Sequence, residues 1–428
     1  MKPETENKRN NKTIAVIGAG ASGCFCAMLA ADYGYNVLLI EHTDYIAKKI
    51  LMTGNGKCNL SNKELKADCY VSDYKDKDIF LQHAFDVCGY EKTIAIFKKH
   101  GLFVKDKKEL LYPASFQASS VTEFFLRQLK RKNIQILLKT SVKNIYKDNI
   151  FCIETSKNTY YADYVVLACG GRSYEKTGSD GSGFLLAKTL KHTVTDIYPA
   201  LVKYVCKESF FKQISGLRAD ANVRLYVKDF ILSERGEVQL TDNGVSGIPV
   251  FQLSLLAGKT VSGIKGAIDF VWDMPEDELI RAIVDIKTVY ADLNPEIVSP
   301  HALDALSGLV PKKLIKCVME REGIDPFKVT ELLTEKEIKR IARRLKNFDF
   351  TIKESAGYDN AQVTAGGVSL EEMTQSLESK IMPGLFMVGE MVDITGMCGG
   401  YNLQWAWTSA YLALVNGIIN YENTNITN

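Results

Sequence analysis

The stretch TIAVIGAGASGCFCAMLAADYGYNVLLIE, residues 13–41, decides the fold of this chain. It begins with a short apolar run, passes through three glycines spaced GxGxxG, and continues in an uncharged helical pattern before a second apolar run. That order predicts a buried parallel strand, a tight turn, a helix and the next strand. Glu41 closes the second strand about twenty residues after the turn, which is the spacing of a dinucleotide-binding fold.

Each glycine of the turn has its own predicted role. Gly18 permits the tight turn, Gly20 leaves room for a pyrophosphate, and Gly23 lets the helix pack closely on the strand. The helix N-terminus offers free N–H groups to phosphates, and Glu41 is expected to accept hydrogen bonds from the adenosine ribose. The alternative is a glycine-rich turn without a nucleotide, which accounts for fewer of these spaced features.

The composition indicates a globular protein of more than one domain. The chain has 428 residues, of which 46% are apolar and 24% charged, and its net charge of +2 gives no general attraction to nucleic acid or acidic membranes. Its ten cysteines contain no CxxC pair and its five histidines stand apart, so neither a dithiol centre nor a metal site is expected. Scattered thiols favour a reducing, cytoplasmic location.

Residues 14–31 could be mistaken for a targeting segment or a short membrane span. They form an uncharged stretch preceded by Lys8, Arg9 and Lys12. The glycine spacing favours the nucleotide-binding turn instead, and no other stretch approaches the length of a membrane span. No membrane association is therefore expected.

Two later segments favour FAD over NAD. YYADYVVLACGG (160–171) predicts a buried strand running into a small-residue turn, and it resembles a second flavoprotein signature with Cys169 in the usual Thr place. GLFMVGE (384–390) resembles a third signature, with Glu390 where an Asp usually holds the ribityl chain. No second GxGxxG is present, so a dedicated NAD(P)H domain is not expected.

The segment MCGGYNLQWAW (397–407) predicts the start of the last helix. Its N-terminus would supply N–H donors to the pyrimidine end of a flavin. Gly399 and Gly400 lack a Cβ, so backbone and flavin could approach closely there. One stripe on this helix has the spacing of core residues: Leu403, Trp407 and Tyr411.

Segments along the whole chain resemble one bacterial and archaeal family of FAD-dependent oxidoreductases, which includes 3-dehydro-bile-acid Δ4,6-reductases and proteins labelled aminoacetone oxidases. The matching segments are KKILMTGNGKCNLSN (48–62), LYPASFQASSV (111–121), TGSDGSG (177–183), QLTDNGVSGIPVFQLS (239–254), AQVTAGGV (361–368) and GEMVDITGMCGGYNLQWAW (389–407). Gly56 and Lys57 depart slightly from the more usual Gly-Gly-Gly-Arg wording of the first segment.

The resemblance implies an α/β protein with a glutathione-reductase-like, two-segment FAD-binding Rossmann domain, residues 1–193 and 350–428. Between the segments, short predicted strands indicate an inserted β-barrel or sandwich at 194–273. Helical spacing from Pro275 and a capping box at Thr334 and Glu337 indicate helices at 274–349. By resemblance this insert forms a lid over the flavin.

The fingerprint and the resemblance together predict FAD as cofactor, with NAD(P)H as a transient electron donor. Val142 would meet the adenine through its backbone. The predicted cofactor-binding residues are Gly18, Gly20, Ala21, Ser22, Gly23, Glu41, His42, Lys49, Thr53, Gly54, Asn55, Gly56, Cys58, Asn59, Val142, Ala168, Gly170, Gly178, Asp180, Thr364, Gly366, Gly367, Gly389, Glu390, Gly399, Gly400, Tyr401 and Asn402.

Three functions follow from these features. The first is an NAD(P)H-dependent ene-reductase of a small apolar carbonyl compound, implied by resemblance to be a 3-oxo-Δ4 or Δ4,6 bile-acid intermediate. Tyr401 is the predicted proton donor or partner of the substrate carbonyl, and its alternative role is packing on the flavin ring. The second is an amine oxidase that releases peroxide. The third is a non-catalytic FAD protein whose basic helix, TEKEIKRIARRLKN (334–347), binds RNA or a protein. A solvated helix face is the simpler interpretation of that helix, and no nucleic-acid partner is expected.

Overall fold

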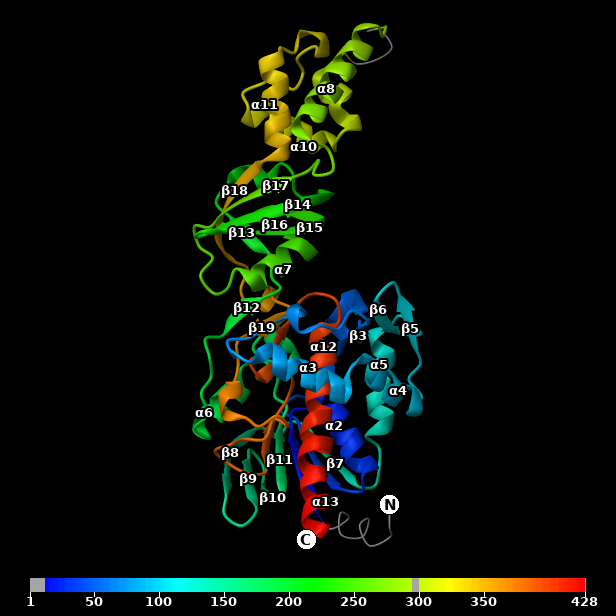
Figure 1. Ribbon diagram of the computed structural model, residues 1–428, viewed down its shortest axis with the longest axis vertical. Coiled ribbons are helices and arrows are strands. Elements are labelled where there is room, and N and C mark those ends of the chain that lie inside the picture. The colour runs from blue at the N-terminus through cyan, green and yellow to red at the C-terminus, as the bar shows by residue number, and fades with distance from the viewer. Residues whose placement is uncertain (1–11, 295–299, 428) are drawn as a thin grey trace. The chain divides into compact units, whose positions relative to one another are not determined.

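The computed structural model describes residues 12–294 and 300–427 (Figure 1). The chain forms two compact units. The first contains the residues up to Ala200 together with those from Tyr358 onward, and the second contains Leu201–Gly357.

A parallel sheet forms the centre of the first unit. Its strands, in spatial order, are β20 (Leu385–Met387), β11 (Tyr164–Leu167), β1 (Thr13–Ile17), β2 (Asn36–Ile40) and β7 (Ile134–Leu137). Each neighbouring pair is parallel. The apolar runs become these strands because a parallel sheet covered on both faces buries every side chain along its length. The predicted nucleotide-binding domain is therefore present.

Two helices that are far apart in sequence lie side by side in this unit. Helix α2 (Ala21–Asp32) follows the glycine turn, and α12 (Tyr401–Tyr411) runs beside it before continuing as a π-helical segment, Leu412–Ile419, and α13 (Asn420–Thr427) (Figure 1). Trp407 is fully buried in a cluster of aromatic rings that includes Phe25 and Phe97. The prediction that the stripe Leu403, Trp407 and Tyr411 belongs to the core is confirmed for Trp407 and Tyr411, whereas Leu403 is only half-buried.

Shorter elements complete the first unit. The helices are α3 (Lys77–Cys88), α4 (Tyr90–Lys99), α5 (Ala118–Gln128) and α6 (Ser182–Thr189), with a 3-10 segment at Lys48–Gly56. The small sheets are β3 (Ser61–Asn62) with β6 (Leu110–Pro113) and β5 (Val104–Lys107); β8 (Val142–Lys147) with β9 (Phe151–Thr155) and β10 (Thr159–Ala162); β12 (Tyr198–Ala200) with β19 (Val363–Ala365); and β4 (Tyr70–Val71) with β21 (Thr395–Gly396).

One predicted strand is wrong in its extent. The segment 160–171 forms two strands, β10 and β11, that belong to different sheets. The break is at Asp163, whose carboxylate accepts the backbone N–H of Thr13 at 2.7 Å. The aromatic residues of the segment hide this break, although β11 is fully buried and β10 is partly exposed.

The second unit contains a closed six-stranded barrel and a group of helices. The barrel order is β13 (Tyr204–Cys206), β16 (Gly244–Gly247), β15 (Phe230–Thr241), β14 (Arg218–Val227), β17 (Lys265–Asp269) and β18 (Phe348–Ser355). The helices are α7 (Ile248–Leu256), α8 (Glu276–Ala291), α9 (Ala302–Ala305), α10 (Lys312–Arg321) and α11 (Glu335–Lys346). Helices α8, α10 and α11 gather at one end of the barrel (Figure 1). Of the two predicted alternatives, the barrel is therefore correct.

The edges of the insert differ slightly from those predicted. Strand β18 pairs with β13 and β17, so residues 350–357 lie in the second unit rather than in the nucleotide-binding domain. Strand β12 pairs with β19, so residues 194–200 lie in the first unit. Neither edge could be predicted from the sequence, because pairing between strands that are far apart in the chain has no local sequence pattern.

The capping box at the start of α11 is confirmed. The Thr334 hydroxyl accepts the N–H of Glu337 at 3.3 Å, and the Glu337 carboxylate accepts the N–H of Thr334 at 2.8 Å. Pro275 precedes α8 as its N-cap instead of lying in the first turn. Among the helices in the described part of the chain, none has the length and apolar character to cross a bilayer.

Candidate cofactor-binding site

A long cavity lies at the carboxyl ends of β1, β2 and β11 in the first unit. It encloses about 1470 Å³, including space open to solvent at its mouth. Predicted residues that line it are Gly18, Gly20, Ala21, Ser22, Glu41, His42, Lys49, Thr53, Val142, Ala168, Gly170, Gly178, Asp180, Glu390 and Asn402. Ligands of open parallel sheets bind at this edge, where helix N-termini and loop residues converge.

The three glycines of the turn have different surroundings. A Cβ on Gly18, whose φ is +100°, would lie 2.5 Å from the carbonyl oxygen of Ala168, and one on Gly23 would lie 1.9 Å from that of Gly18. A Cβ on Gly20 would meet nothing within 4 Å. Gly18 and Gly23 therefore serve packing, whereas Gly20 borders open space where a pyrophosphate can approach the backbone.

No side chain caps the N-terminus of α2, which begins at Ala21 after Gly20. The first backbone N–H groups of the helix are thus available to an anion, and the helix dipole favours negative charge there. This end of the cavity has the chemistry that a diphosphate requires.

Glu41 is held in place before any ligand binds. Its Oε2 accepts the N–H of Ala19 and its Oε1 accepts the N–H of Thr43, each at 2.8 Å, and the residue is 8% exposed. A carboxylate oxygen has two acceptor positions, and Oε1 also lies 3.3 Å from the His42 Nδ1, so Oε2 is the oxygen that keeps a position for a further donor. A ribose hydroxyl fits that remaining capacity.

Two loops meet beside Glu41. The His42 Nε2 lies 3.8 Å from a carboxylate oxygen of Asp180, and both side chains line the cavity. A Cβ on Gly178, whose φ is +101°, would lie 2.9 Å from the Thr43 side chain. Val142, the first residue of β8, also lines this end. The loop that follows β11 therefore encloses the predicted adenosine end together with the loop that follows β2.

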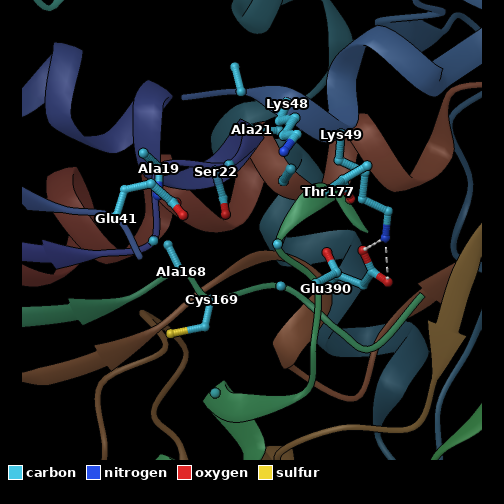
Figure 2. Close-up of a pocket in the computed structure, with 18 of the residues that line it drawn as sticks. Ala19, Ala21, Ser22, Glu41, Lys48, Lys49, Ala168, Cys169, Thr177 and Glu390 are labelled. Carbon is cyan, nitrogen blue, oxygen red and sulfur yellow. Dashed lines mark hydrogen bonds and ion pairs between the residues drawn. The ribbon is translucent and has the colours of Figure 1, made fainter. Parts of the chain in front are cut away.

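An ion pair forms the other part of the cavity wall. The Lys49 Nζ lies 2.8 and 3.1 Å from the two carboxylate oxygens of Glu390, which sits well apart from Glu41 (Figure 2). The same carboxylate accepts the N–H of Thr364 at 3.0 Å, and its Oε1 lies 2.6 Å from where a Cβ on Gly171 would be. The Glu390 carboxylate is therefore fixed, and it retains capacity for a hydroxyl donor on Oε2.

The structure shows a reason of its own for the double glycine before α12. Gly399 and Gly400 have φ of +126° and +93°, a region that favours glycine. A Cβ on Gly400 would lie 2.8 Å from the backbone carbonyl of Ser61. The close approach is thus to the Ser61 segment, and the predicted approach of a flavin to these glycines stays a prediction.

Tyr401 is not among the residues that line the cavity. Its ring packs edge-on against Tyr70, and its hydroxyl donates to the carbonyl of Glu64 at 3.3 Å. Burial raises the pKa of the Tyr401 phenol well above its ordinary value. These contacts give no support to Tyr401 as a proton donor, and that role stays a prediction. Asn402 does line the cavity, and its amide bonds both the N–H and the carbonyl of Gly396.

Several predicted residues do not form the cavity wall. Thr364 acts behind it, because its hydroxyl accepts the N–H groups of Arg172 and Ser173 at 2.7 and 3.1 Å. The others that the structure places outside the wall are Gly23, Gly54, Asn55, Gly56, Cys58, Asn59, Gly366, Gly367, Gly389, Gly399, Gly400 and Tyr401. Their predicted contacts with the cofactor are not tested by these surroundings.

Other lining residues were missed by sequence analysis. They include Ala19, Tyr45, Lys48, Thr140, Ser141, Thr177, Ser179, Ser182, Gly183, Leu186, Gln362, Val363, Leu403, Trp405 and Ala406. Lys48 and Thr177 stand next to predicted residues or within matching segments, so they could have been found. Trp405 carried only the signal of a core aromatic. Gln362 and Val363 lie within the matching segment 361–368 and could have been found in the same way, whereas Leu186 carried no signal.

The cavity wall contains a cysteine thiol. Cys169 lines the cavity, and burial raises the pKa of its thiol to about 12, so the thiolate is scarce at neutral pH. Within residues 12–294 and 300–427, no group of three or more His, Cys, Asp or Glu side chains is placed to hold a metal ion.

The open space at Gly20, the uncapped start of α2 and the preorganised Glu41 fit the diphosphate and ribose of FAD. Fold and site together define an FAD-binding Rossmann protein. The chain belongs to the HI0933-like family, because the family model described as the HI0933-like protein Rossmann domain matches residues 12–416. It is an FAD-dependent oxidoreductase of that family.

The chain is similar to several known proteins. It is 37% identical over 414 residues to a 3-dehydro-bile acid Δ(4,6)-reductase of Clostridium scindens, covering 94% of this chain and 97% of the relative. It is 26% identical to a ribosomal RNA dihydrouridine synthase of Escherichia coli, covering 92% and 95%. A 3-ketosteroid-Δ4-(5α)-dehydrogenase of Rhodococcus jostii is similar in structure, with a TM-score of 0.48 and 13% identity over 94% of this chain and 97% of that one.

Proposed function

We propose that this protein reduces a carbon–carbon double bond conjugated to a ketone in a 3-oxo-Δ4 or Δ4,6 bile-acid intermediate, with NAD(P)H as electron donor in the cytoplasm. The observation that carries the proposal is the 37% identity to a 3-dehydro-bile acid Δ(4,6)-reductase along almost the full length of both chains. The cavity supports it because its walls fit FAD, which carries hydride chemistry.

When bound, FAD supplies the hydride that it has received from NAD(P)H. In the proposed reaction the β-carbon of the enone gains that hydride and the α-carbon gains a proton, so the double bond becomes CH–CH and NAD(P)⁺ is released. The role of the chain's own residues is to bind FAD and orient it. The start of α2 would hold the diphosphate, Glu41 would hold the ribose, and Glu390 with Lys49 would hold the ribityl chain.

The decisive experiment separates the two half-reactions. Anaerobic protein loaded with FAD is mixed with NADH or NADPH, and bleaching of the flavin absorbance is recorded by stopped flow. A 3-oxo-Δ4,6 bile acid is then added, and recovery of the oxidised flavin spectrum is expected in step with loss of the dienone absorbance. Bleached flavin that the dienone fails to reoxidise would contradict the proposal.

Reduction of uridine in ribosomal RNA is a second candidate. The full-length similarity to a ribosomal RNA dihydrouridine synthase favours it. The chemistry is related, since the C5=C6 bond of uracil is conjugated to a carbonyl. Because these relatives are less similar to this chain than the bile-acid reductase, we place this function second.

The charges of the second unit argue against an RNA-binding surface there. Residues 201–357 contain 23 Lys and Arg and 23 Asp and Glu, so this unit has no net positive charge. Arg340 and Arg344 of α11 both pair with Glu322. Further pairs join Arg343 to Glu276 and Lys346 to Asp269. A cation that is already paired with a carboxylate gains less electrostatic energy from a phosphate, so fewer counterions are released from RNA when it binds.

The candidates are separated by one comparison of acceptors. NAD(P)H-reduced protein is offered the dienone bile acid or unmodified ribosomal RNA without oxygen. Oxidised protein without pyridine nucleotide is offered aminoacetone in air as an amine-oxidase substrate. Reoxidation by RNA with dihydrouridine formed, and none by the dienone, would establish the second candidate. Peroxide released from aminoacetone without pyridine nucleotide would establish an amine oxidase instead.

A further inference from the structure

We propose that Trp405 and Ser409 of α12 position the Glu390 carboxylate for FAD, because they hydrogen-bond the carbonyl and the N–H of Gly389, the residue before it. This inference depends on FAD binding, which the proposed function also requires, but not on the identity of the substrate. It assigns a role to a tryptophan that sequence analysis placed in the last helix without a contact.

The hold consists of three buried hydrogen bonds. The indole Nε1–H of Trp405 donates to the carbonyl of Gly389 at 3.1 Å. The N–H of Gly389 donates to the hydroxyl of Ser409 at 2.9 Å, and that hydroxyl donates to the carbonyl of Trp405 at 2.6 Å. Trp405 is 1% exposed and Ser409 is fully buried. Both polar groups of Gly389 are therefore bound to one helix.

The opposite side of Gly389 is equally confined. Its φ is +71°, and a Cβ there would lie 2.6 Å from the Ser22 hydroxyl in the first turn of α2. The residue is thus enclosed between α12 and the helix that begins at the phosphate-binding turn. Glycine is required at this point both by its backbone conformation and by the lack of space.

Glu390 follows directly, so its side chain starts from a fixed backbone. Its carboxylate accepts the N–H of Thr364 at 3.0 Å and pairs with Lys49, and both Glu390 and Trp405 line the cavity. A shift of the Gly389 peptide groups would move this carboxylate relative to the N-terminus of α2. Since the ribityl chain joins the phosphates to the flavin ring, that relative position governs FAD affinity.

The same helix provides a matched control. The indole Nε1–H of Trp407 donates to the carbonyl of Leu60 at 3.0 Å, and Trp407 is also fully buried. Replacing either tryptophan with phenylalanine therefore removes one indole N–H and the same volume from the core. Only Trp405 is bonded to the residue before Glu390.

The experiment is a double-mutant cycle on apoprotein titrated with FAD, followed by quenching of flavin fluorescence. Trp405→Phe and Trp407→Phe are compared in the wild-type background and in Glu390→Gln. We expect Trp405→Phe to raise the Kd for FAD about tenfold, which corresponds to about 1.4 kcal/mol. In the Glu390→Gln background the same change should raise Kd by about twofold or less, because the carboxylate that it positions is gone. Trp407→Phe should have the same effect in both backgrounds.

A second pair of measurements excludes a purely structural role. Ser409→Ala removes the hydroxyl that accepts the N–H of Gly389 and leaves the aromatic rings unchanged. Its effect on the Kd for FAD should depend on Glu390 in the same way as that of Trp405→Phe. The midpoint potential of bound flavin should shift in Trp405→Phe and not in Trp407→Phe. Equal effects of Trp405→Phe in both backgrounds, or an unchanged Kd, would overturn the inference. Wild-type protein that takes up no FAD would overturn it together with the proposed function, whereas failure to reduce the dienone would leave it standing.

Discussion

Replacing Gly20 with alanine should separate the stability of the fold from its affinity for FAD. The residue has φ of −77° and ψ of −161°, which an alanine can adopt, and a Cβ there meets nothing within 4 Å. The apoprotein therefore has room for the methyl group. The fingerprint predicts that the pyrophosphate occupies this same space, so the protein with FAD bound has no room for the methyl group.

The two effects have opposite signs. Alanine in place of glycine at a compatible position restricts the unfolded chain and stabilises the protein by about 0.4–1 kcal/mol, which raises Tm by about 1–3 °C. Forcing an extra methyl group against a bound diphosphate costs about 1–3 kcal/mol of binding free energy, so Kd for FAD rises roughly fivefold to 150-fold.

The assay is thermal unfolding of apoprotein beside FAD titration of the same preparation. Gly23→Ala is the control, because its Cβ would lie 1.9 Å from the carbonyl oxygen of Gly18 and the fold itself should be destabilised. Gly20→Ala that binds FAD as tightly as the wild type would refute the assignment of the pyrophosphate site. Gly20→Ala that unfolds like Gly23→Ala would refute the distinction between the two glycines.

Three further predictions concern charge and pH. Burial lowers the pKa of His192, against the opposing effect of Glu372 at 3.0 Å. As the pH drops below about 6.5, the unfolded chain binds a proton at this histidine before the folded chain does, so the free energy of unfolding should fall. Urea unfolding at pH 7.5 and 5.5 should show this fall in the wild type and not in His192→Gln. Burial raises the pKa of Asp393 to about 6, although its carboxylate accepts the N–H of Asp73 at 3.0 Å. The folded state therefore loses stability as the pH rises from about 4 to 6, and Asp393→Asn should be more stable than the wild type at pH 7.5 by about 1–3 kcal/mol. An equal or lower stability of Asp393→Asn would contradict this role of burial. Glu322 accepts hydrogen bonds from Arg340 and Arg344 at 3.1 and 2.7 Å; Glu322→Gln should lower the free energy of unfolding of the second unit by about 1–3 kcal/mol in calorimetry and leave Kd for FAD unchanged.

Local patterns predicted the parts of the site that are contiguous in sequence. The turn from Gly18 to Gly23, the strand that ends at Glu41 and the capping box at Thr334 are each complete within a few residues, and the structure confirms them. Their physics is local too, since backbone dihedral angles, helix ends and strand alternation are set by neighbours along the chain. The segment that ends at Glu390 was recognised for the same reason.

The sequence by itself determined the class of fold and the candidate positions for a phosphate and a ribose. Tertiary structure decided the contacts between distant segments. Only in the folded chain does Lys49 meet Glu390, does Trp405 bond to Gly389, and does Gly400 face Ser61. Such contacts depend on how two complete elements pack against each other, and packing is specified by the whole core rather than by any single stretch.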